Sequence, residues 1–365
     1  MLDIESVITN RPPQLIPFFS ICIPQYNRTD FLIKACESFA SQTFQNFELC
    51  ISDDCSNDGK REGLLDYLRN SGLTYSYAPL KNNLRYDGNL RSAVALSSGQ
   101  YLLLMGNDDG LSNNDVLRKI REDLLHFQPV AVAITNYRDI PSGRVVRRIS
   151  THGLIGSGPA VAVSTFRNYS FVSGIVLDGD GARREATDKC DGSEMYQMYL
   201  GTRLIAAGGQ FLAIDKVCVD KDLQIENQVV DSYRLKPKAD RYPIVERPLP
   251  MGRLLEVVAA GLEPFHQGAA RENNLLNIAS QLYRYTFPFW IVEYRRIQSW
   301  QFAVGVLFAL RPTRLAQSSP LSAWATLQLW LMYIPSAVAA IAIPIRLFDA
   351  LHARMYEIAK RLRSV

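Results

Sequence analysis

The sequence predicts an α/β fold with a mostly parallel, doubly wound sheet flanked by helices. Strand-like and helix-like segments alternate through about the first 140 residues, which is typical of strand-helix-strand units. Hydrophobic residues make up 47% of the chain and charged residues 21%, as in ordinary globular proteins. A chain of 365 residues is long enough for about two domains.

Each predicted strand is a short apolar run that ends at a turn-forming or polar residue. These runs are residues 18–23, 47–52, 73–77, 100–105, 130–136 and 211–214. Each predicted helix repeats apolar residues at a spacing of three or four, which places them on one face. The helices fall around residues 31–39, 64–68, 87–96, 116–124 and 195–206.

Two kinds of boundary are also predicted. Thr29 or Asp30 is expected to cap the first helix, and Ser193 the last, because short polar side chains favour that position. Residues 141–190 are rich in Gly, Ser and Arg. We expect them to form a long, partly mobile connection with short strand-like pieces, since loops of that length usually serve a function.

Several classes of protein are disfavoured by the sequence. The six cysteines form no Cys-x-x-Cys pair, which disfavours zinc and thioredoxin-type sites. Neither a Gly-x-Gly-x-x-Gly nor a P-loop motif is present, which disfavours those phosphate-binding loops. A net charge of +4 is too small to indicate a nucleic-acid partner, and we expect none.

Two acidic pairs lie where predicted strands end, Asp53-Asp54 and Asp108-Asp109. Ligands of open α/β sheets bind beyond the carboxyl ends of the strands. Mg²⁺ and Mn²⁺ are often held there by one or two carboxylates together with substrate phosphates. The alternative is that these residues only form turns, as Asp and Asn commonly do.

Three stretches support the first interpretation together. They are SICIPQYNR (20–28), SQTFQNFELCISDDCSND (41–58) and SSGQYLLLMGNDD (97–109). In this order they resemble the family-2 inverting glycosyltransferases of the GT-A fold, a Rossmann-like sheet flanked by helices. The resemblance is good over residues 18–125 and weaker over 126–220. Gly-Asn-Asp-Asp and the run NNLRYDGNL (82–90) are most similar to bacterial transferases of O-antigen sugars, such as abequosyltransferases.

The resemblance implies a role for each matching residue. Pro24, Tyr26 and Asn27 would line the nucleotide pocket. Asp54 would accept a hydrogen bond from the nucleobase. Asp109 would be the principal ligand of a divalent metal, Mn²⁺ or Mg²⁺, and Asp108 would contact the sugar or the metal's waters.

The sequence departs from the family pattern at two places. Asn107 replaces the first carboxylate of the Asp-x-Asp motif. The Glu-Asp pair that supplies the catalytic base in relatives would fall on Tyr196-Gln197, and neither residue is acidic. Inverting transfer needs a carboxylate base, and the nearby candidates are Asp191 and Glu194. Alternatively, Asp191 caps a turn and Glu194 complements a helix dipole.

The resemblance therefore implies a glycosyltransferase. Its donor would be a nucleoside-diphosphate sugar and its acceptor a lipid-linked or surface glycan. A catalytically silent GT-A scaffold in a glycan-assembly complex is the alternative that the missing Glu-Asp pair leaves open. A sugar-phosphate nucleotidyltransferase is less favoured, because the expected Gly-rich loop with Arg or Lys is not present after the first strand.

The end of the chain differs from the rest. From Arg311 to Val365 there are seven basic and two acidic residues, and residues 315–345 carry no charge. Residues 323–345 are long enough to cross a bilayer, which takes about 20 residues, and basic residues after them favour the cytoplasmic side. A surface-lying, re-entrant or buried helix is the alternative. The basic residues are Arg346, Arg354, Lys360, Arg361 and Arg363, and the expected interfacial anchors are Trp324, Trp330 and Tyr333.

We therefore expect three regions. They are a catalytic domain over 18–220, a helical extension over 221–300 and a membrane-associated tail over 301–365. The N-terminal segment MLDIESVITN carries two acids and no apolar core, unlike a signal peptide. The expected location is the cytoplasmic face of the bacterial inner membrane.

Overall fold

A computed structural model describes residues 4–14, 16–228, 250–317 and 321–351. The chain divides into two compact units, Met1–Val230 and Asp231–Val365. The first contains the whole region 18–220, in which the catalytic domain is expected. Most of the expected extension and the whole expected tail fall together in the second.

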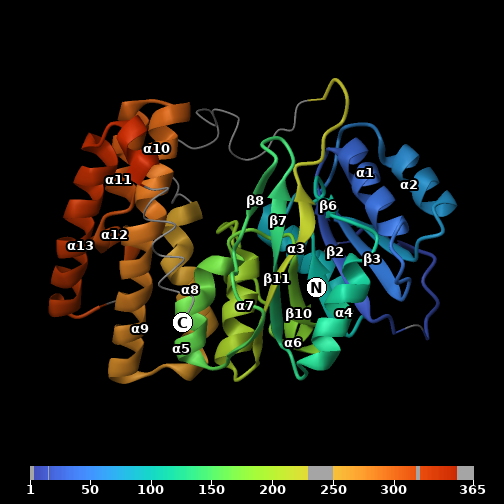
Figure 1. Ribbon diagram of the computed structural model, residues 1–365, viewed down its shortest axis with the longest axis horizontal. Helices are drawn as coiled ribbons and strands as arrows, with labels where there is room; N and C mark the ends of the chain where they lie inside the picture. Colours follow the sequence, from blue (N-terminus) through green and yellow to red (C-terminus); the bar gives the residue numbers. More distant parts are fainter. Residues whose placement is uncertain (1–3, 15, 229–249, 318–320, 352–365) are drawn as a thin grey trace. The chain divides into compact units, whose positions relative to one another are not determined.

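Among the described residues of the first unit, eleven strands form one sheet (Figure 1). The order is β1-β4-β3-β2-β5-β10-β7-β11-β6, with β8 on β7 and β9 on β11. Strands β4, β3, β2 and β5 are parallel, while β10 is antiparallel to both of its neighbours. The strands are β1 (Ile8–Thr9), β2 (Phe19–Gln25), β3 (Phe47–Asp53), β4 (Tyr75–Pro79), β5 (Tyr101–Leu104), β6 (Gly110–Leu111), β7 (Val132–Asp139), β8 (Arg144–Val146), β9 (Gly153–Gly156), β10 (Ile175–Asp178) and β11 (Phe211–Lys221).

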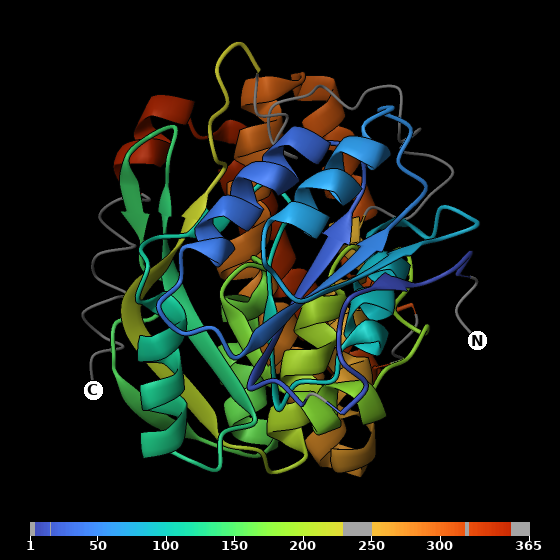
Figure 2. The same cartoon turned by 90° about the vertical axis from the view of Figure 1, so that its right-hand side faces the viewer.

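Helices cover both faces of this sheet, as parallel strands require. Apolar side chains of α1 (Thr29–Ala40), α2 (Arg61–Asn70) and α4 (Val116–His126) share one core cluster with alternate residues of β2 and β3. Figure 2 shows α1 and α2 side by side. On the other face α3 (Arg85–Leu96) contacts β2, β3, α6 (Gly179–Arg184) and α7 (Tyr196–Ala206). The predicted α/β sheet flanked by helices is confirmed. The sheet is parallel across β4, β3, β2 and β5 but mixed as a whole, because antiparallel pairs surround β10 and join the outer strands.

The structure differs from prediction between residues 141 and 190. This stretch is not mainly a connection, because it forms β8, β9, β10, α6, a helix α5 (Pro159–Thr165) and a 3₁₀ turn η1 (Phe166–Tyr169). Strand β10 lies between β5 and β7, and Ile175, Val176 and Leu177 are buried there. The expected short strand-like pieces are therefore real strands, and one of them, β10, lies inside the sheet.

The predicted helix caps are wrong. The N-cap residue of α1 is Arg28, which has a left-handed backbone, and its side chain makes no capping hydrogen bond. Instead Thr29 N donates to Asp58 Oδ2 at 3.1 Å. Helix α7 is not capped by Ser193 either, and Tyr196 N donates to Asp87 Oδ1 at 3.0 Å. At both helix N-termini a backbone N–H group therefore donates to a carboxylate from a distant segment. No local sequence rule detects such contacts.

The second unit is helical in the residues that the structure describes (Figure 1). Helix α9, a π-helical turn η4 and α10 follow one another without a break. Helix α13 continues through Pro335 and ends before Pro344. The elements are η2 (Pro250–Arg253), α8 (Leu254–Leu262), η3 (Glu263–Phe265), α9 (Gly268–Gln281), η4 (Leu282–Thr286), α10 (Phe287–Ile297), α11 (Trp300–Ala309), α12 (Pro312–Leu315) and α13 (Ala323–Ala342).

Candidate functional site

The carboxyl ends of the parallel strands collect most of the predicted site residues. Pro24 lies within β2, and Tyr26 and Asn27 follow it. Asp54 follows β3, which runs parallel to β2 in a register that pairs Gln25 with Asp53. The Asp108-Asp109 pair follows β5 on the other side of β2. Because these strands are parallel, the three loops lie at one edge of the sheet.

Hydrogen bonds join these loops to one another. Asn107 Nδ2 donates to Gln25 Oε1 at 2.8 Å and to Asn27 O at 3.3 Å. Asn27 N donates to Ser56 Oγ at 2.8 Å, which links the β2 loop to the β3 loop. Asn107, which stands where the family pattern has a carboxylate, thus supplies an amide donor that holds the β2 and β5 loops together.

Three carboxylates meet at this edge, and we call Asp108, Asp109 and Asp222 the acidic triad. One carboxylate oxygen from each residue lies within 4.8 Å of one oxygen of each of the other two. Asp222 follows β11, and the antiparallel pairing of β11 with β6 brings it to the loop after β5. Asp222 N donates to Asp109 Oδ1 at 2.9 Å, and Leu223 N donates to Asp108 O at 2.8 Å.

Sequence reasoning missed Asp222. The strand was expected to end at Ile214, because Asp215-Lys216 interrupts the apolar run. The structure places a register shift between Ile214 and Val217, after which β11 continues to Lys221. After an irregularity of this kind the strand continues, and its pairing with the neighbouring strand resumes in a shifted register. The alternating run around Val219 was the available signal for the longer strand.

Two basic side chains balance part of the triad's charge. Arg28 forms an ion pair with Asp108, and Lys221 forms one with Asp222. Lys221 Nζ also lies 3.1 Å from Asp139 Oδ1. These cations come from the segments after β2 and at the end of β11. The triad is therefore an acidic group in direct contact with a guanidinium and an ammonium group.

Burial perturbs two members of the triad. Burial, together with the neighbouring Asp108 carboxylate, raises the pKa of Asp109 to about 8. Burial also raises the pKa of Asp108. A divalent cation favours ionised ligands and releases their protons. Three carboxylates within reach of one point are hard oxygen ligands, so the triad fits Mg²⁺ or Mn²⁺.

A buried serine fixes the orientation of Asp109. Ser173 Oγ is hydrogen-bonded to Asp109 Oδ2 and accepts from Gly106 N at 2.8 Å. The segment around Ser173 is held by Arg148, which donates to Phe171 O and Ser173 O at 2.8 Å each. Burial lowers the pKa of Arg148 to about 10. Ser173 and Arg148 are site residues that no sequence motif indicated.

Asp54 joins the β3 loop to the start of α3. Its Oδ1 accepts from Leu84 N at 2.6 Å, and Asn83 Nδ2 donates to Asp54 O at 3.0 Å. Burial raises the pKa of Asp54 to about 6, while backbone hydrogen bonds from Leu84 and Arg85 oppose the shift. The run 82–90 is thus an organised start to α3, and the nucleobase contact of Asp54 stays a prediction.

The candidate bases lie in the loop before α7. Asp87 in the first turn of α3 accepts from Glu194 N at 2.8 Å, so this loop meets α3 at the end that follows β4. That end belongs to the same sheet edge as the triad. Arg91 holds Asp191 through two hydrogen bonds, one of 2.9 Å. Glu194 is half-buried and has a left-handed backbone with φ of 59°. Its use as a base, or that of Asp191, stays a prediction.

Tyr196 and Gln197, which stand where the family's acidic pair is expected, have structural roles. Tyr196 is fully buried. Gln197 Oε1 accepts from Tyr86 OH at 2.9 Å, and its Nε2 donates to Ser170 O at 3.2 Å. Gln197 therefore connects α3 to the segment that carries Ser173. The amide serves as a bridge, whereas a carboxylate there could not donate to Ser170 O.

Taken together, the α/β sheet, the interlocked loops at its carboxyl edge and the acidic triad are those of a domain of the GT-A type. Residues 20–177 match the family model described as Glycosyl transferase family 2. The chain therefore carries a glycosyl transferase family 2 domain, and the predicted resemblance is confirmed.

Curated relatives share part of this domain. The chain is 34% identical over 99 residues to abequosyltransferase RfbV of Salmonella typhimurium, which is 27% of this chain and 30% of the relative. It is 24% identical over 114 residues to a GalNAc(5)-diNAcBac-PP-undecaprenol β-1,3-glucosyltransferase of Campylobacter jejuni, covering 30% of this chain and 37% of the relative. The chain thus spans about a third of the length of these relatives.

A solved structure shares the fold over a greater length. S. aureus TarS 1–349 in complex with UDP-GlcNAc superposes with a TM-score of 0.58 at 14% sequence identity. The alignment covers 88% of this chain and 90% of that one. At this identity the likeness concerns the fold alone.

Proposed function

We propose that the protein transfers a sugar from a nucleoside-diphosphate donor onto a lipid-linked or surface-glycan acceptor. The observation that carries this proposal is the acidic triad at the carboxyl edge of a family-2 domain. A UDP-sugar complex of a protein with the same fold supports the donor class. The undecaprenol diphosphate in the name of one relative supports the acceptor class.

In this proposal the triad holds Mn²⁺ or Mg²⁺, with Asp109 as the principal ligand and Asp108 and Asp222 beside it. When bound, the cation neutralises the diphosphate leaving group as a Lewis acid. Arg28 and Lys221 already lie against the triad, so both can donate to anionic oxygen atoms there. Excess negative charge from a donor would then be balanced by groups of this chain.

The remaining site residues bind and orient the donor and the acceptor. Tyr26 exposes 45% of its surface beside Asn27 and Pro24, which suits contact with a nucleoside. Asp54 is the proposed acceptor of a nucleobase hydrogen bond. Glu194 or Asp191 takes the proton from the acceptor hydroxyl. Asp191 would have to leave Arg91 in order to act as the base.

The direct test is turnover with labelled sugar nucleotides carrying UDP, GDP, CDP or dTDP, with Mn²⁺ and a bacterial lipid extract. We expect one donor to be transferred or hydrolysed, and Asp109→Asn to stop the reaction. Donor binding without any turnover would instead support the silent scaffold. Synthesis of a sugar nucleotide from a nucleoside triphosphate and a sugar phosphate would establish the nucleotidyltransferase alternative and overturn the proposal.

We also propose that the second unit holds the enzyme on the cytoplasmic face of the bacterial inner membrane. Within the described residues, one helix is long and apolar enough to cross a bilayer, α13, with a mean hydropathy of 1.5. The exposed Arg346 follows it, and basic residues near such a helix favour the cytoplasmic side. Arg354, Lys360, Arg361 and Arg363 lie outside the described residues.

Fractionation of the full-length protein tests the attachment. We expect it in the membrane fraction after a high-salt wash, and its release by detergent. Full-length protein that stays in solution without detergent at high salt would contradict the attachment, while leaving the sugar-transfer proposal untouched.

A further inference from the structure

Helix α13 presents a continuous apolar face to the surroundings. Five of its side chains are between 48% and 66% exposed. They recur at alternating spacings of three and four residues, which places them in one row along the helix. We call this row the outer stripe: Trp324, Leu327, Leu331, Ile334 and Val338.

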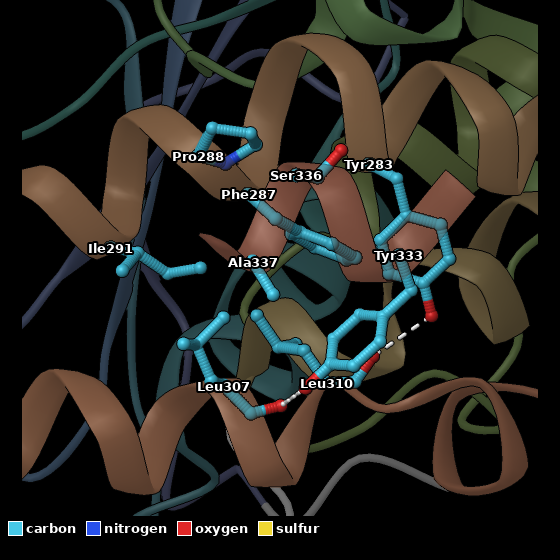
Figure 3. Close-up of a pocket in the computed structure, with 9 residues that line it drawn as sticks. All are labelled: Tyr283, Phe287, Pro288, Ile291, Leu307, Leu310, Tyr333, Ser336 and Ala337. Carbon is cyan, nitrogen blue, oxygen red and sulfur yellow. Dashed lines mark hydrogen bonds between the residues drawn. The ribbon is translucent and has the colours of Figure 1, made fainter. Parts of the chain in front are cut away.

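The opposite face of α13 is packed against its own unit. Ala325, Leu329 and Ala340 are buried. Tyr333 OH donates to Leu307 O of α11 at 2.8 Å. In Figure 3, Tyr333 and Ala337 line a small cavity together with residues of η4, α10 and α11. Helix α13 is therefore one wall of a helical bundle and does not stand alone.

Both ends of α13 are fixed to one long helical rod, α9-η4-α10. At the start, Ser322 N donates to Glu272 Oε1 of α9 at 3.3 Å. At the end, Arg295 Nη1 of α10 donates to Ala340 O and Ile343 O, each at 2.8 Å. The rod and α13 thus run side by side in the same direction over the whole length of α13.

This arrangement does not suit a helix that crosses a bilayer. If α13 crossed, the rod beside it would cross as well. Arg284 lies near the middle of the rod and is exposed, so its guanidinium would enter the hydrocarbon core. A charged side chain at that depth is costly and normally faces a protein interior or water.

We propose that the outer stripe inserts lengthwise into one leaflet of a lipid bilayer, so that α13 lies in the membrane plane. This rests on the proposed membrane attachment and specifies its geometry. Trp324 at the start of the stripe has the side chain that favours the membrane interface. Arg346 follows the helix and is exposed, where it can meet anionic headgroups.

A second copy of the chain is the other possible occupant of the stripe. The alternating spacing of three and four also occurs in coiled coils, whose flanking positions normally carry charges that set the pairing. Here those positions hold Gln328, Trp330, Pro335 and Ala337, and no charged residue. Nothing in that pattern would fix the register of a pair, so the stripe favours lipid.

The first experiment measures binding of the full-length protein to vesicles of phosphatidylethanolamine and phosphatidylglycerol. The double variant Leu331→Gln/Ile334→Gln should lower the vesicle-bound partition coefficient by more than about tenfold, because burial of each aliphatic side chain drives partitioning. The matched control is Val145→Gln, an exposed apolar position of the first unit, and it should bind as the parent does. Undiminished binding of the double variant would overturn the proposal.

The second experiment measures depth. Nitroxide labels are placed at Trp324→Cys, Leu331→Cys and Val338→Cys in a Cys55→Ser background, because Cys55 is the one free cysteine that is not buried. An in-plane helix predicts equal depths at all three positions. A crossing helix would spread the outer two over about 20 Å, at 1.5 Å per residue, and would overturn the proposal.

The alternative occupant and the proposed function have separate outcomes. Self-association without lipid that the double variant abolishes, together with no vesicle binding by the parent, would assign the stripe to a second copy and overturn the proposal. Nucleotide binding of each variant is measured alongside. A parent protein that binds no nucleotide would contradict the proposed function. The depths measured for the nitroxide labels would still test the in-plane geometry, because they depend only on contact with lipid.

Discussion

The acidic triad and the outer stripe depart from the usual distribution of side chains in opposite directions. The triad buries carboxylates, which normally face water, and the stripe exposes large apolar side chains, which are normally buried. Carboxylates of the triad have Arg28, Lys221 and Ser173 as partners within the chain. The apolar side chains of the outer stripe are instead exposed to the surroundings. The first region is therefore suited to a small charged ligand and the second to an extended apolar one.

The largest expected effect is at the triad. Asp109→Asn should weaken Mn²⁺ binding by more than about 100-fold. Mutating a residue that only hydrogen-bonds to a metal ligand already lowers metal affinity by about 10–100-fold, and Asp109 is proposed to be a ligand itself. Isothermal calorimetry of Mn²⁺ with a nucleoside diphosphate measures it, and vesicle binding should not change. The control is Asp66→Asn, an exposed acid on α2. Mn²⁺ affinity equal to that of the parent would remove Asp109 from the metal site, and a joint loss of vesicle binding would mean that the two regions are not independent.

The base should affect turnover without affecting binding. Glu194→Gln or Asp191→Asn should lower kcat by about 10²–10⁴-fold, the usual contribution of general base catalysis, with donor affinity unchanged. Single-turnover assays with the labelled donor measure this. Asp180→Asn serves as the control, because its side chain is 89% exposed. Near-normal turnover in both variants and in the double variant would place the base elsewhere.

Ser173 should affect the triad through Asp109. Ser173→Ala removes the buried hydroxyl bonded to Asp109 Oδ2 and should lower Mn²⁺ affinity by about 10–100-fold. The exposed Ser164→Ala variant should behave as the parent. An unchanged Mn²⁺ affinity, with an unchanged melting temperature, would show that the hydroxyl does not orient the carboxylate.

Asp54 should affect donor binding with or without metal. Asp54→Ala should weaken donor binding by about 1–3 kcal/mol, the cost of leaving a buried partner unsatisfied. Because Asp54 also accepts from Leu84 N, the melting temperature is measured in parallel. A fall in stability with no change in the dissociation constant would assign Asp54 to the loop alone and contradict the nucleobase contact.

The smallest expected effect is the pH dependence of the metal-free protein. Asp109 has a pKa of about 8 when folded and an ordinary value of 3.8. Between these values the folded state keeps a proton that the unfolded chain has lost, so stability falls as pH rises. We expect the melting temperature to fall less steeply in Asp109→Asn than in the parent, and Mn²⁺ to reduce the slope in the parent. Equal slopes would contradict a raised pKa of the buried Asp109 carboxyl group.

The two regions also differ in how far the sequence predicts them. The loops after β2, β3 and β5 were predicted because short motifs sit at the ends of clear strands. Asp222 and Ser173 were not, because each reaches Asp109 only through the pairing of β11 with β6 or the position of β10. Arg148 donates to backbone carbonyl groups, and because every residue has one, the sequence does not indicate which of them it contacts.

In the second unit, the apolar composition of residues 323–345 predicted a membrane helix without its geometry. Length and hydropathy are the same for a crossing and a surface-lying helix. The distinction depends on Glu272 and Arg295, which fix both ends of α13 to the rod from more than forty residues away. Contacts of that sequence separation cannot be read from the local pattern.

The proposed role of the acidic triad is to bind a nucleoside diphosphate together with a divalent metal. A thermal-shift panel of UDP, GDP, CDP and dTDP, each with and without Mn²⁺, tests it most directly, because binding to the folded state raises stability by RT ln(1 + [L]/Kd). We expect one nucleotide to raise the melting temperature, Mn²⁺ to enlarge the rise, and Asp109→Asn to remove the enlargement. No rise with any of the four nucleotides, or an equal Mn²⁺-dependent rise in Asp109→Asn, would contradict it.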